Sequence, residues 1–256
     1  MDDFQIKFLD IIKTRRTVRR YKKDLPISKE QLMILAEAAE FAPSGQGQQF
    51  FELLFVTENA KIKAIHDAIK KVWENMAPQL AGILNTWISI EVFQKRLNET
   101  KETGISWCAS CPTQCEKSKG ELNFDVYACR TRLAYRSATA LLVLLIKNDH
   151  KKQWKKAAKE KEINKDLMDM WTNSWSAIEE ASVNNAVENV LLTAKVLNIG
   201  TCFTYSCRLA EKEIKKILNI PRNLDMHSII CLGIPDEEPK LKPRRDLNQI
   251  VHFNEY

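Results

Sequence analysis

Glycine is scarce in this sequence, with 7 residues among 256. Loops that cradle a nucleotide phosphate through backbone N–H groups need several glycines at fixed spacing, as in G-x-G-x-x-G or G-x-x-x-x-G-K-[ST]. Neither pattern occurs in the chain. If the protein binds a phosphate, we therefore expect side chains rather than a glycine-rich loop to hold it.

Proline is also sparse, at 8 residues. The hydrophobic share of 45% and the charged share of 28% are those of an ordinary globular protein, which excludes a disordered or collagen-like chain. A chain of this length can bury a large core without disulfides. Strand-like and helix-like segments alternate without a dividing linker, so we expect a single mixed α/β or α+β domain over residues 1–256.

Long apolar runs are missing as well. The longest, at residues 138–146, has the length of a strand and falls far short of the roughly 18 residues of a membrane-spanning helix. The first residues contain no apolar stretch typical of a signal peptide. The 7 cysteines are an odd number and favour reduced thiols or metal ligands over a disulfide framework. These features predict a cytoplasmic protein with no membrane partner.

Positive charges exceed negative charges by six, and they are unevenly spread. Residues 147–165 mix lysines with acidic residues, which is typical of a solvated surface. Two compact basic clusters lie near the ends of the chain, at 15–23 and 240–245. Because neither has the interleaved aromatic residues of single-strand binders, we do not expect a nucleic-acid partner.

The first cluster has the composition of a phosphate grip. In an extended segment, Arg15, Thr17 and Arg19 would lie on one side, where two guanidinium groups and a hydroxyl could bind phosphate oxygens. Lys242 and Arg244 could add charge from the other end of the chain. The spacing alone leaves two alternatives open, a phosphate site or a solvated basic surface.

Hydrophobic periodicity and helix breakers locate the secondary structure. Helices are predicted at 4–14, 28–41, 59–74, 77–98, 126–137, 175–197 and 211–218, and strands at 50–56, 138–147, 201–206 and 228–233. Ser28 and Gln31 form a capping box at the start of the second helix. Pro78 suits the first turn of a helix, and Gly200 is the expected left-handed residue after the long helix.

Five segments, in the same order, resemble motifs of the nitroreductase family of flavin enzymes. Residues 12–21 (IKTRRTVRRY) resemble its R-R-S-x-R-x-F/Y opening, and residues 42–50 (APSGQGQQF) its A-P-S-x-x-N-x-Q-P loop. Residues 185–194 (NAVENVLLTA) look like its central helix, and residues 197–203 (LNIGTCF) like its L-G-x-G-x-x-W turn. Residues 232–239 (LGIPDEEP) with 242–245 (KPRR) are similar to its G-x-P…K-P-R ending. The motifs span residues 12–252, and 60–180 contribute little.

The resemblance implies an α+β nitroreductase-like fold, with a central and mostly antiparallel sheet flanked by helices. It also implies a homodimer with one FMN at each of two sites in the interface. The residues implied to hold the FMN phosphate and ribityl chain are Arg15, Arg16, Thr17, Arg19, Lys242 and Arg244. The residues implied to line the flavin ring of the other subunit are Pro43, Ser44, Gly45, Gln46 and Gln49. Backbone N–H groups near Thr204 and Tyr205 would face the flavin N5 and O4 atoms.

The family's chemistry needs no protein general base. NAD(P)H would deliver hydride to the flavin and leave, and a small acceptor such as a nitroaromatic or a quinone would then take the electrons, in a ping-pong cycle. No catalytic side chain is therefore predicted. None of the four histidines (His66, His150, His227 and His252) lies in a motif with a partnered acid, so each is expected to be structural or on the surface.

The resemblance does not explain a cysteine segment within residues 75–135, where the family has a variable lid. Cys108, Cys111 and Cys115 have C-x2-C-x3-C spacing, and Cys129 follows. We expect reduced thiols and no metal, with a zinc or iron–sulfur site or a redox pair as alternatives. A cluster there would allow a ferredoxin-type donor in place of NAD(P)H.

Two other functions stay open beside the reductase. One is a specialised flavoenzyme of the same fold, for dehalogenation or flavin cleavage, selected by the lid. The other is a flavin-binding or electron-storage protein without turnover. The remaining cysteines, Cys202, Cys207 and Cys231, lie on predicted strands and are expected to be small buried apolar residues.

Overall fold

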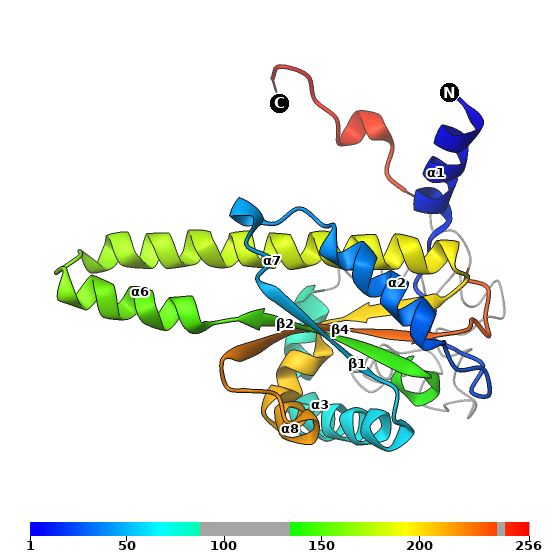
Figure 1. The fold of residues 1–256 in the computed structure, drawn as a ribbon, viewed down its shortest axis with the longest axis horizontal. Coiled ribbons are helices and arrows are strands. Elements are labelled where there is room, and N and C mark those ends of the chain that lie inside the picture. The colour runs from blue at the N-terminus through cyan, green and yellow to red at the C-terminus, as the bar shows by residue number, and fades with distance from the viewer. Residues whose placement is uncertain (88–133, 240–243, 256) are drawn as a thin grey trace.

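The computed structural model describes residues 1–87, 134–239 and 244–255 of the chain (Figure 1). Its helices are α1 (Asp3–Thr14), α2 (Lys29–Glu40), α3 (Asn59–Trp87), α6 (Asp149–Glu160), α7 (Lys165–Val196) and α8 (Glu211–Leu218). Its strands are β1 (Phe51–Val56), β2 (Ala140–Lys147), β3 (Gly200–Thr204) and β4 (Leu224–Gly233). Short 3-10 turns are η1 (Gly45–Gly47), η3 (Ser206–Ala210) and η4 (Leu247–Gln249).

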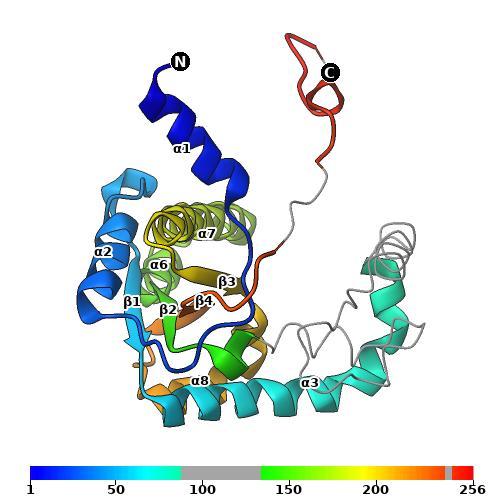
Figure 2. The ribbon, with the colours of Figure 1, turned by 90° about the vertical axis from the view of Figure 1, so that its right-hand side faces the viewer.

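The four strands form one antiparallel sheet in the order β1-β2-β4-β3. Helices cover both of its faces: α2 and α7 lie on one, and α3 and α8 on the other (Figures 1 and 2). Strand β2 shows why, since Leu141 and Val143 join the core with α3 and α8, while Leu142 and Leu144 join the core with α2 and α7. Successive side chains of a strand point to opposite faces of the sheet, so a strand that is apolar on both faces needs a helical layer on each. The predicted α+β fold is confirmed.

One irregularity of the sheet bears on the site. Leu144 pairs with Ser228 and Leu145 with Met226, so β4 has His227 as an extra residue without a partner in the register. Such a β-bulge bends the strand and re-aims the side chains around it. Met226 and Ile229 therefore both join the core with α3 and α8, although three residues separate them.

Several local predictions are confirmed. The side chain of Ser28 accepts a hydrogen bond from Gln31 N, and the Gln31 side chain accepts one from Ser28 N, which completes the capping box. Leu32 and Leu35 are buried on the inner face of α2. The predicted strands appear within a few residues of their expected ends.

Other local predictions are wrong. Helix α3 continues past Pro78 to Trp87, because a proline can kink a helix without ending it. Helix α7 begins at Lys165 rather than at 175, where Asn164 caps it by accepting hydrogen bonds from two backbone N–H groups. The left-handed residue after α7 is Asn198, with φ of 56°, and not Gly200. Gly200 is needed for another reason, since a Cβ there would lie 2.9 Å from Val18 Cγ1.

Part of the sequence interpretation lies outside the described residues. The predicted lid at 75–135 falls mainly on 88–133, together with Cys108, Cys111, Cys115 and Cys129, and Lys242 lies in the undescribed stretch 240–243. Among the helices of the described ranges, none is long and apolar enough to cross a membrane.

Candidate flavin site

The basic segment, residues 15–23, runs from the end of α1 along the free edge of β3 and past the end of β4. Val18 N donates to Thr201 O at 2.8 Å, and Lys22 N donates to Ile234 O at 2.9 Å. Tyr21 is 2% exposed, and its hydroxyl donates to Val18 O at 2.7 Å and lies 3.1 Å from Cys231 O. These contacts fix the backbone from which the arginines project.

Arginines from both ends of the chain meet at this edge. The Nε atoms of Arg15 and Arg16 are buried and have no hydrogen-bond partner among the residues that the structure describes. Burial, followed by the charges of Arg244 and Arg15, lowers the pKa of the Arg16 guanidinium. The nearest acid to Arg15 is Glu188 Oε1, 4.0 Å from its Nε. Several like charges with free donors favour an anion between them.

The carboxylates nearby are engaged elsewhere. Glu237 Oε1 accepts hydrogen bonds from the backbone N of Arg19 at 2.5 Å and of Arg20 at 3.3 Å. Asp236 lies 3.9 Å from the Arg20 guanidinium. The charges of Arg15 and Arg244 thus both act on the Arg16 guanidinium, and the phosphate-binding role of the three stays a prediction. Among the described residues, the structure shows no contact between the Arg19 side chain and these arginines, so the phosphate-binding role of Arg19 also stays a prediction.

The 42–50 loop is anchored on α7. Gly45 N donates to Ser182 Oγ at 3.1 Å, and Asn185 Nδ2 donates to Pro43 O at 3.2 Å. A Cβ at Gly45 would come within 2.2 Å of Ile178 Cγ2, so only glycine permits this approach. The loop is thereby held against the stretch of α7 that precedes Glu188.

The rest of the loop turns through left-handed backbone. Gln46 has φ of 54° and Gln49 has φ of 45°, and Ser44 Oγ accepts a hydrogen bond from Gln49 N at 3.1 Å. Gln46 and Gln49 are exposed. In Figure 1 the 42–50 loop lies over the middle of α7, and the basic segment lies near the C-terminal end of that helix. The α7 residues that the two segments contact, Asn185 and Glu188, are about one helical turn apart.

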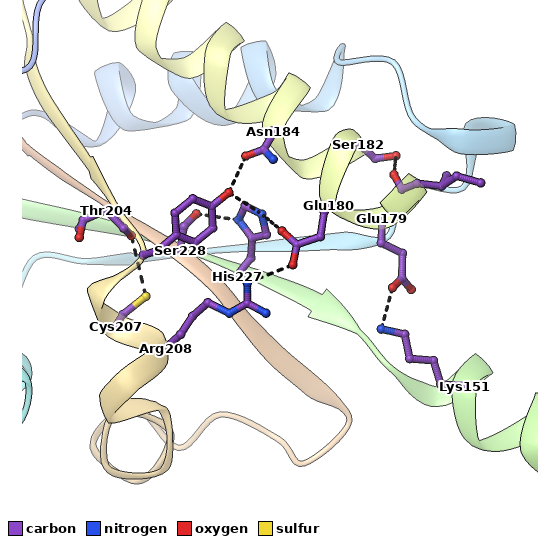
Figure 3. A network of polar contacts seen from close by, with 12 residues as sticks. Lys151, Glu179, Glu180, Ser182, Asn184, Thr204, Cys207, Arg208, His227 and Ser228 are labelled. Carbon is purple, nitrogen blue, oxygen red and sulfur yellow. Dashed lines mark hydrogen bonds and ion pairs between the residues drawn. The ribbon is translucent and has the colours of Figure 1, made fainter. Parts of the chain in front are cut away.

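The turn after β3 is held by its own side chains. Thr204 Oγ1 accepts a hydrogen bond from Ser206 N at 3.1 Å, and Arg208 N donates to Tyr205 O at 3.0 Å. The Tyr205 hydroxyl donates to Asn184 Oδ1 on α7 at 2.9 Å (Figure 3). Burial raises the pKa of the Tyr205 phenol, so the group is protonated at neutral pH.

Beside Tyr205 lies a histidine with a partnered acid. His227 is fully buried, and its Nε2 is 2.9 Å from Glu180 Oε2 and 3.4 Å from the Tyr205 hydroxyl. Arg208 Nη1 lies 3.1 Å from Glu180 Oε1. We call Glu180, Asn184, Tyr205, Arg208 and His227 the Tyr205 network (Figure 3).

The prediction that no histidine has an acid beside it is therefore wrong. Besides the His227–Glu180 pair, His150 Nε2 lies 2.6 Å from Glu179 Oε1, at ion-pair distance but without hydrogen-bond angles. Glu179 is 1% exposed and also contacts Lys151 Nζ at 2.7 Å. Tertiary folding brings these groups together from different elements, and no local motif announces them.

A cavity of about 530 Å³ lies where α6 meets the first part of α7, next to the 42–50 loop. Its aromatic walls include Phe50, Trp154, Trp171 and Trp175, with Gln46 and Gln48 from the loop. The Trp171 and Trp175 rings stack at 5.9 Å, and the Trp154 and Trp175 rings meet edge-on at 5.3 Å. This cluster holds the loop against the helix pair.

The described cysteines, Cys202, Cys207 and Cys231, are buried, as predicted, and none of these three forms a disulfide. Cys207 lies in η3 rather than on a strand. Burial raises the pKa of Cys207 to about 12 and that of Cys231 well above its ordinary value. Across the described ranges no group of three or more potential metal ligands is found.

Comparisons with known proteins agree with this geometry. The family model described as the nitroreductase family matches residues 12–234. The NADPH-flavin oxidoreductase of Vibrio harveyi is 32% identical over 69 residues, which are 27% of this chain and 29% of that protein. The oxygen-insensitive NADPH nitroreductase of Salmonella typhimurium is 30% identical over 69 residues, with the same coverage. The matched regions thus span less than a third of either relative.

Known structures show the same fold over nearly the whole chain. A BluB-like flavoprotein from Clostridium difficile 630 has a TM-score of 0.66 at 20% identity, covering 100% of both chains. The NADPH:FMN oxidoreductase of Vibrio harveyi, in complex with NAD+, has a TM-score of 0.58 at 17% identity, covering 97% of this chain and 77% of that one.

Proposed function

Because the chain belongs to the nitroreductase family, we propose that it is an FMN-dependent oxidoreductase that takes electrons from NAD(P)H and passes them to small acceptors such as quinones or nitroaromatics. One observation carries the proposal: the charges of Arg15 and Arg244 act on Arg16 at a sheet edge, where the buried Nε donors of Arg15 and Arg16 have no partner within the described part of the chain. Bound FMN would supply hydride chemistry, and the protein would supply binding and orientation. The names of the curated relatives support a nicotinamide donor.

We infer that the basic segment and the C-terminal cluster hold the FMN phosphate. A phosphate would give the orphaned Nε atoms of Arg15 and Arg16 an acceptor and would relieve the repulsion between Arg16 and Arg244. Thr17 would donate a hydroxyl, and Arg19 would bind the phosphate or the ribityl chain. Lys242 is proposed to complete the grip from the family's K-P-R ending.

We also propose that the active form is a homodimer with flavin at its interface. The tip of the 42–50 loop is exposed at Gln46 and Gln49, so it can contact the other subunit's flavin. The residues proposed for this role are Pro43, Ser44, Gly45, Gln46 and Gln49. Exposed apolar residues on α1, such as Phe4 and Phe8, give the chain surface to bury in such an interface.

The remaining proposals concern the turn, the domain and the compartment. Backbone N–H groups near Thr204 and Tyr205 are proposed to face the flavin N5 and O4 atoms. Residues 1–256 are proposed to form one flavin-binding domain, with a lid at about 75–135 that selects the acceptor. We propose a cytoplasmic location because NAD(P)H and reduced thiols are maintained there, and the described cysteines form no disulfide.

The absorbance spectrum of the purified protein tests the proposal. We expect flavin bands near about 370 and about 450 nm that bleach with NAD(P)H and recover with a quinone. A flavin that stays oxidised with every nicotinamide would favour an electron-storage protein or a ferredoxin-fed enzyme. A colourless protein that FMN does not reconstitute would contradict the function altogether.

Arginine variants test the phosphate site. Arg15→Ala with Arg244→Ala should weaken FMN binding by about 10- to 100-fold for each guanidinium removed, since hydrogen bonds to charged groups contribute about 1.5–3 kcal/mol. Arg222→Gln is the matched control, because Arg222 is an exposed arginine in the turn before β4. Fluorescence titration of FMN measures the Kd. Tight retention by the double variant would show that the phosphate binds elsewhere.

A further inference from the structure

The Tyr205 network is not explained by flavin binding. Flavin contacts at this turn are assigned to backbone N–H groups, which leaves the side chains of Tyr205, His227 and Glu180 without a role. We propose that the Tyr205 phenol is the proton donor to the acceptor during its reduction, and that Asn184, His227 and Glu180 position it. The inference rests on the proposed function, which places the flavin beside this turn.

The chemistry of a two-electron acceptor requires such a donor. Converting a quinone to a hydroquinone adds one hydride and one proton. Bound FMN would supply the hydride with its electron pair and would be oxidised as the quinone is reduced. The proton would leave the Tyr205 oxygen for the quinone oxygen, and the tyrosinate would take a proton back from water. General acid catalysis of this kind contributes about 10²–10⁴-fold to a rate.

Tyr205 has the placement that this role requires. Its ring is fixed by edge-on contacts with Phe203 at 4.9 Å and His227 at 5.1 Å. The residue is 39% exposed, so a small acceptor and water can reach it. Its single proton is donated to Asn184 Oδ1, a neutral acceptor that does not remove it, and the O–H would rotate from Asn184 to the acceptor for the transfer.

The β-bulge of β4 supplies the second support. His227 is the extra residue of that strand, and the bulge directs its ring to Tyr205 and to Glu180 on α7. Because Glu180 Oε2 accepts at 2.9 Å, we assign the ring proton to Nε2, and Ser228 Oγ then donates to Nδ1 at 2.8 Å. The same N–H faces the phenol oxygen at 3.4 Å, where it would stabilise a tyrosinate.

The charges around Tyr205 and His227 keep the phenol of Tyr205 protonated and the ring of His227 neutral. Burial and Arg208 lower the pKa of His227, against the opposing charge of Glu180, so the ring is neutral at pH 7 and does not compete for the phenol's role. The pKa of Tyr205 is raised by burial and by the charge of Glu180, whereas Asn184 and Arg208 act in the other direction. The groups that face the pair therefore come from α7 and from η3.

Tyr205→Phe tests the proposal, since it keeps the ring and removes only the hydroxyl. Stopped-flow measurement separates flavin reduction by NADPH from flavin reoxidation by 1,4-benzoquinone. We expect unchanged FMN affinity and an unchanged reductive half-reaction. Reoxidation should slow by about 10²-fold or more and lose its solvent deuterium isotope effect. The control is Tyr135→Phe, which removes a hydroxyl from a ring in the core with α3 and α8.

A second measurement does not depend on turnover. In flavin-free protein, ultraviolet titration of wild type against Tyr205→Phe should reveal one tyrosine that ionises above the ordinary value of 10.0. Glu180→Gln should lower that pKa, because the Glu180 charge helps to raise it. In the holoenzyme, Glu180→Gln should shift the alkaline limb of the reoxidation profile in the same direction.

The outcomes are distinguishable. If wild type binds no FMN, the proposed function falls, and this inference with it. If FMN binds and Tyr205→Phe is reoxidised within two-fold of wild type, the proton donor is refuted while the proposed function stands. If Glu180→Gln leaves the pKa of Tyr205 unchanged, the positioning role of Glu180 is refuted.

Discussion

Substituting Gly233 by alanine should displace the basic segment, residues 15–23, from the edge of the sheet. Gly233 ends β4, and a Cβ built there would lie 2.6 Å from Tyr21 Cβ, 2.7 Å from Cγ and 2.9 Å from Cδ1. Ordinary carbon contacts are about 3.5–4.0 Å, so Tyr21 would have to retreat by about 1 Å. Because Cβ and Cγ lie next to the backbone, turning the ring does not relieve the overlap, and the chain itself must move.

The cost follows from what this movement breaks. Overpacking a buried site costs about 1–3 kcal/mol. The Tyr21 hydroxyl bonds to Val18 O and lies near Cys231 O, and loss of one such hydrogen bond adds about 0.5–1.5 kcal/mol. We therefore expect Gly233→Ala to lower the free energy of unfolding by about 2–4 kcal/mol. For a chain of this size, that lowers Tm by roughly 5–15 °C.

Urea denaturation measures the effect, and a double-mutant cycle identifies its cause. In a Tyr21→Gly background, which also removes the Tyr21 Cβ, the clash is gone, so adding Gly233→Ala should cost less than about 0.5 kcal/mol. Gly47→Ala is the control, because Gly47 has φ of +66° and no neighbouring atom within 4 Å, and only backbone strain of about 1 kcal/mol is expected. FMN affinity should fall with Gly233→Ala. Equal costs of Gly233→Ala in both backgrounds would refute the reasoning.

Two further predictions concern titratable groups. Burial holds the pKa of His227 below its ordinary value of 6.5, so on acidification this histidine takes up a proton in the unfolded chain before it does so in the folded chain. The free energy of unfolding should therefore fall between pH 7.5 and 5.5. Urea denaturation should show a smaller fall for His227→Gln. An equal fall in both proteins would contradict this. Burial raises the pKa of Cys207 to about 12 and also raises that of Cys231, so neither thiol is ionised at pH 8 in the folded protein. Iodoacetamide at pH 8 should therefore label both thiols only after unfolding, as measured by mass spectrometry. Labelling of either thiol in the native protein would contradict their burial.

The fold was predictable wherever apolar periodicity is strong. Strand β2 has seven consecutive buried residues, and the Ser28–Gln31 capping box marks the start of α2. The periodicity fails at α6, where charged residues dominate, and at the first ten residues of α7. Tryptophans of these two helices pack against each other rather than against the sheet. Helix pairs of this kind are stabilised by tertiary contacts that no single segment displays.

The candidate site was predictable only in part. The basic clusters stand out by composition, and the structure brings Arg16 and Arg244 together. The Tyr205 network was missed because its acid comes from α7 and its histidine from β4. A bulge, which strand alternation cannot foresee, turns His227 toward that acid. The spacing of four between Glu180 and Asn184 was the one available signal, and it is common on helices.

Helix α1 has a consequence of a different kind. It buries no residue within one chain, and Phe4 and Phe8 are 75% and 48% exposed. A helix of 12 residues is marginal in water without tertiary contacts. If a second copy covers this face, the helix and the interface form together, and mass action makes the measured stability depend on protein concentration. Dilution would then melt the first residues before the sheet, and the melting temperature would be a property of the solution as well as of the chain.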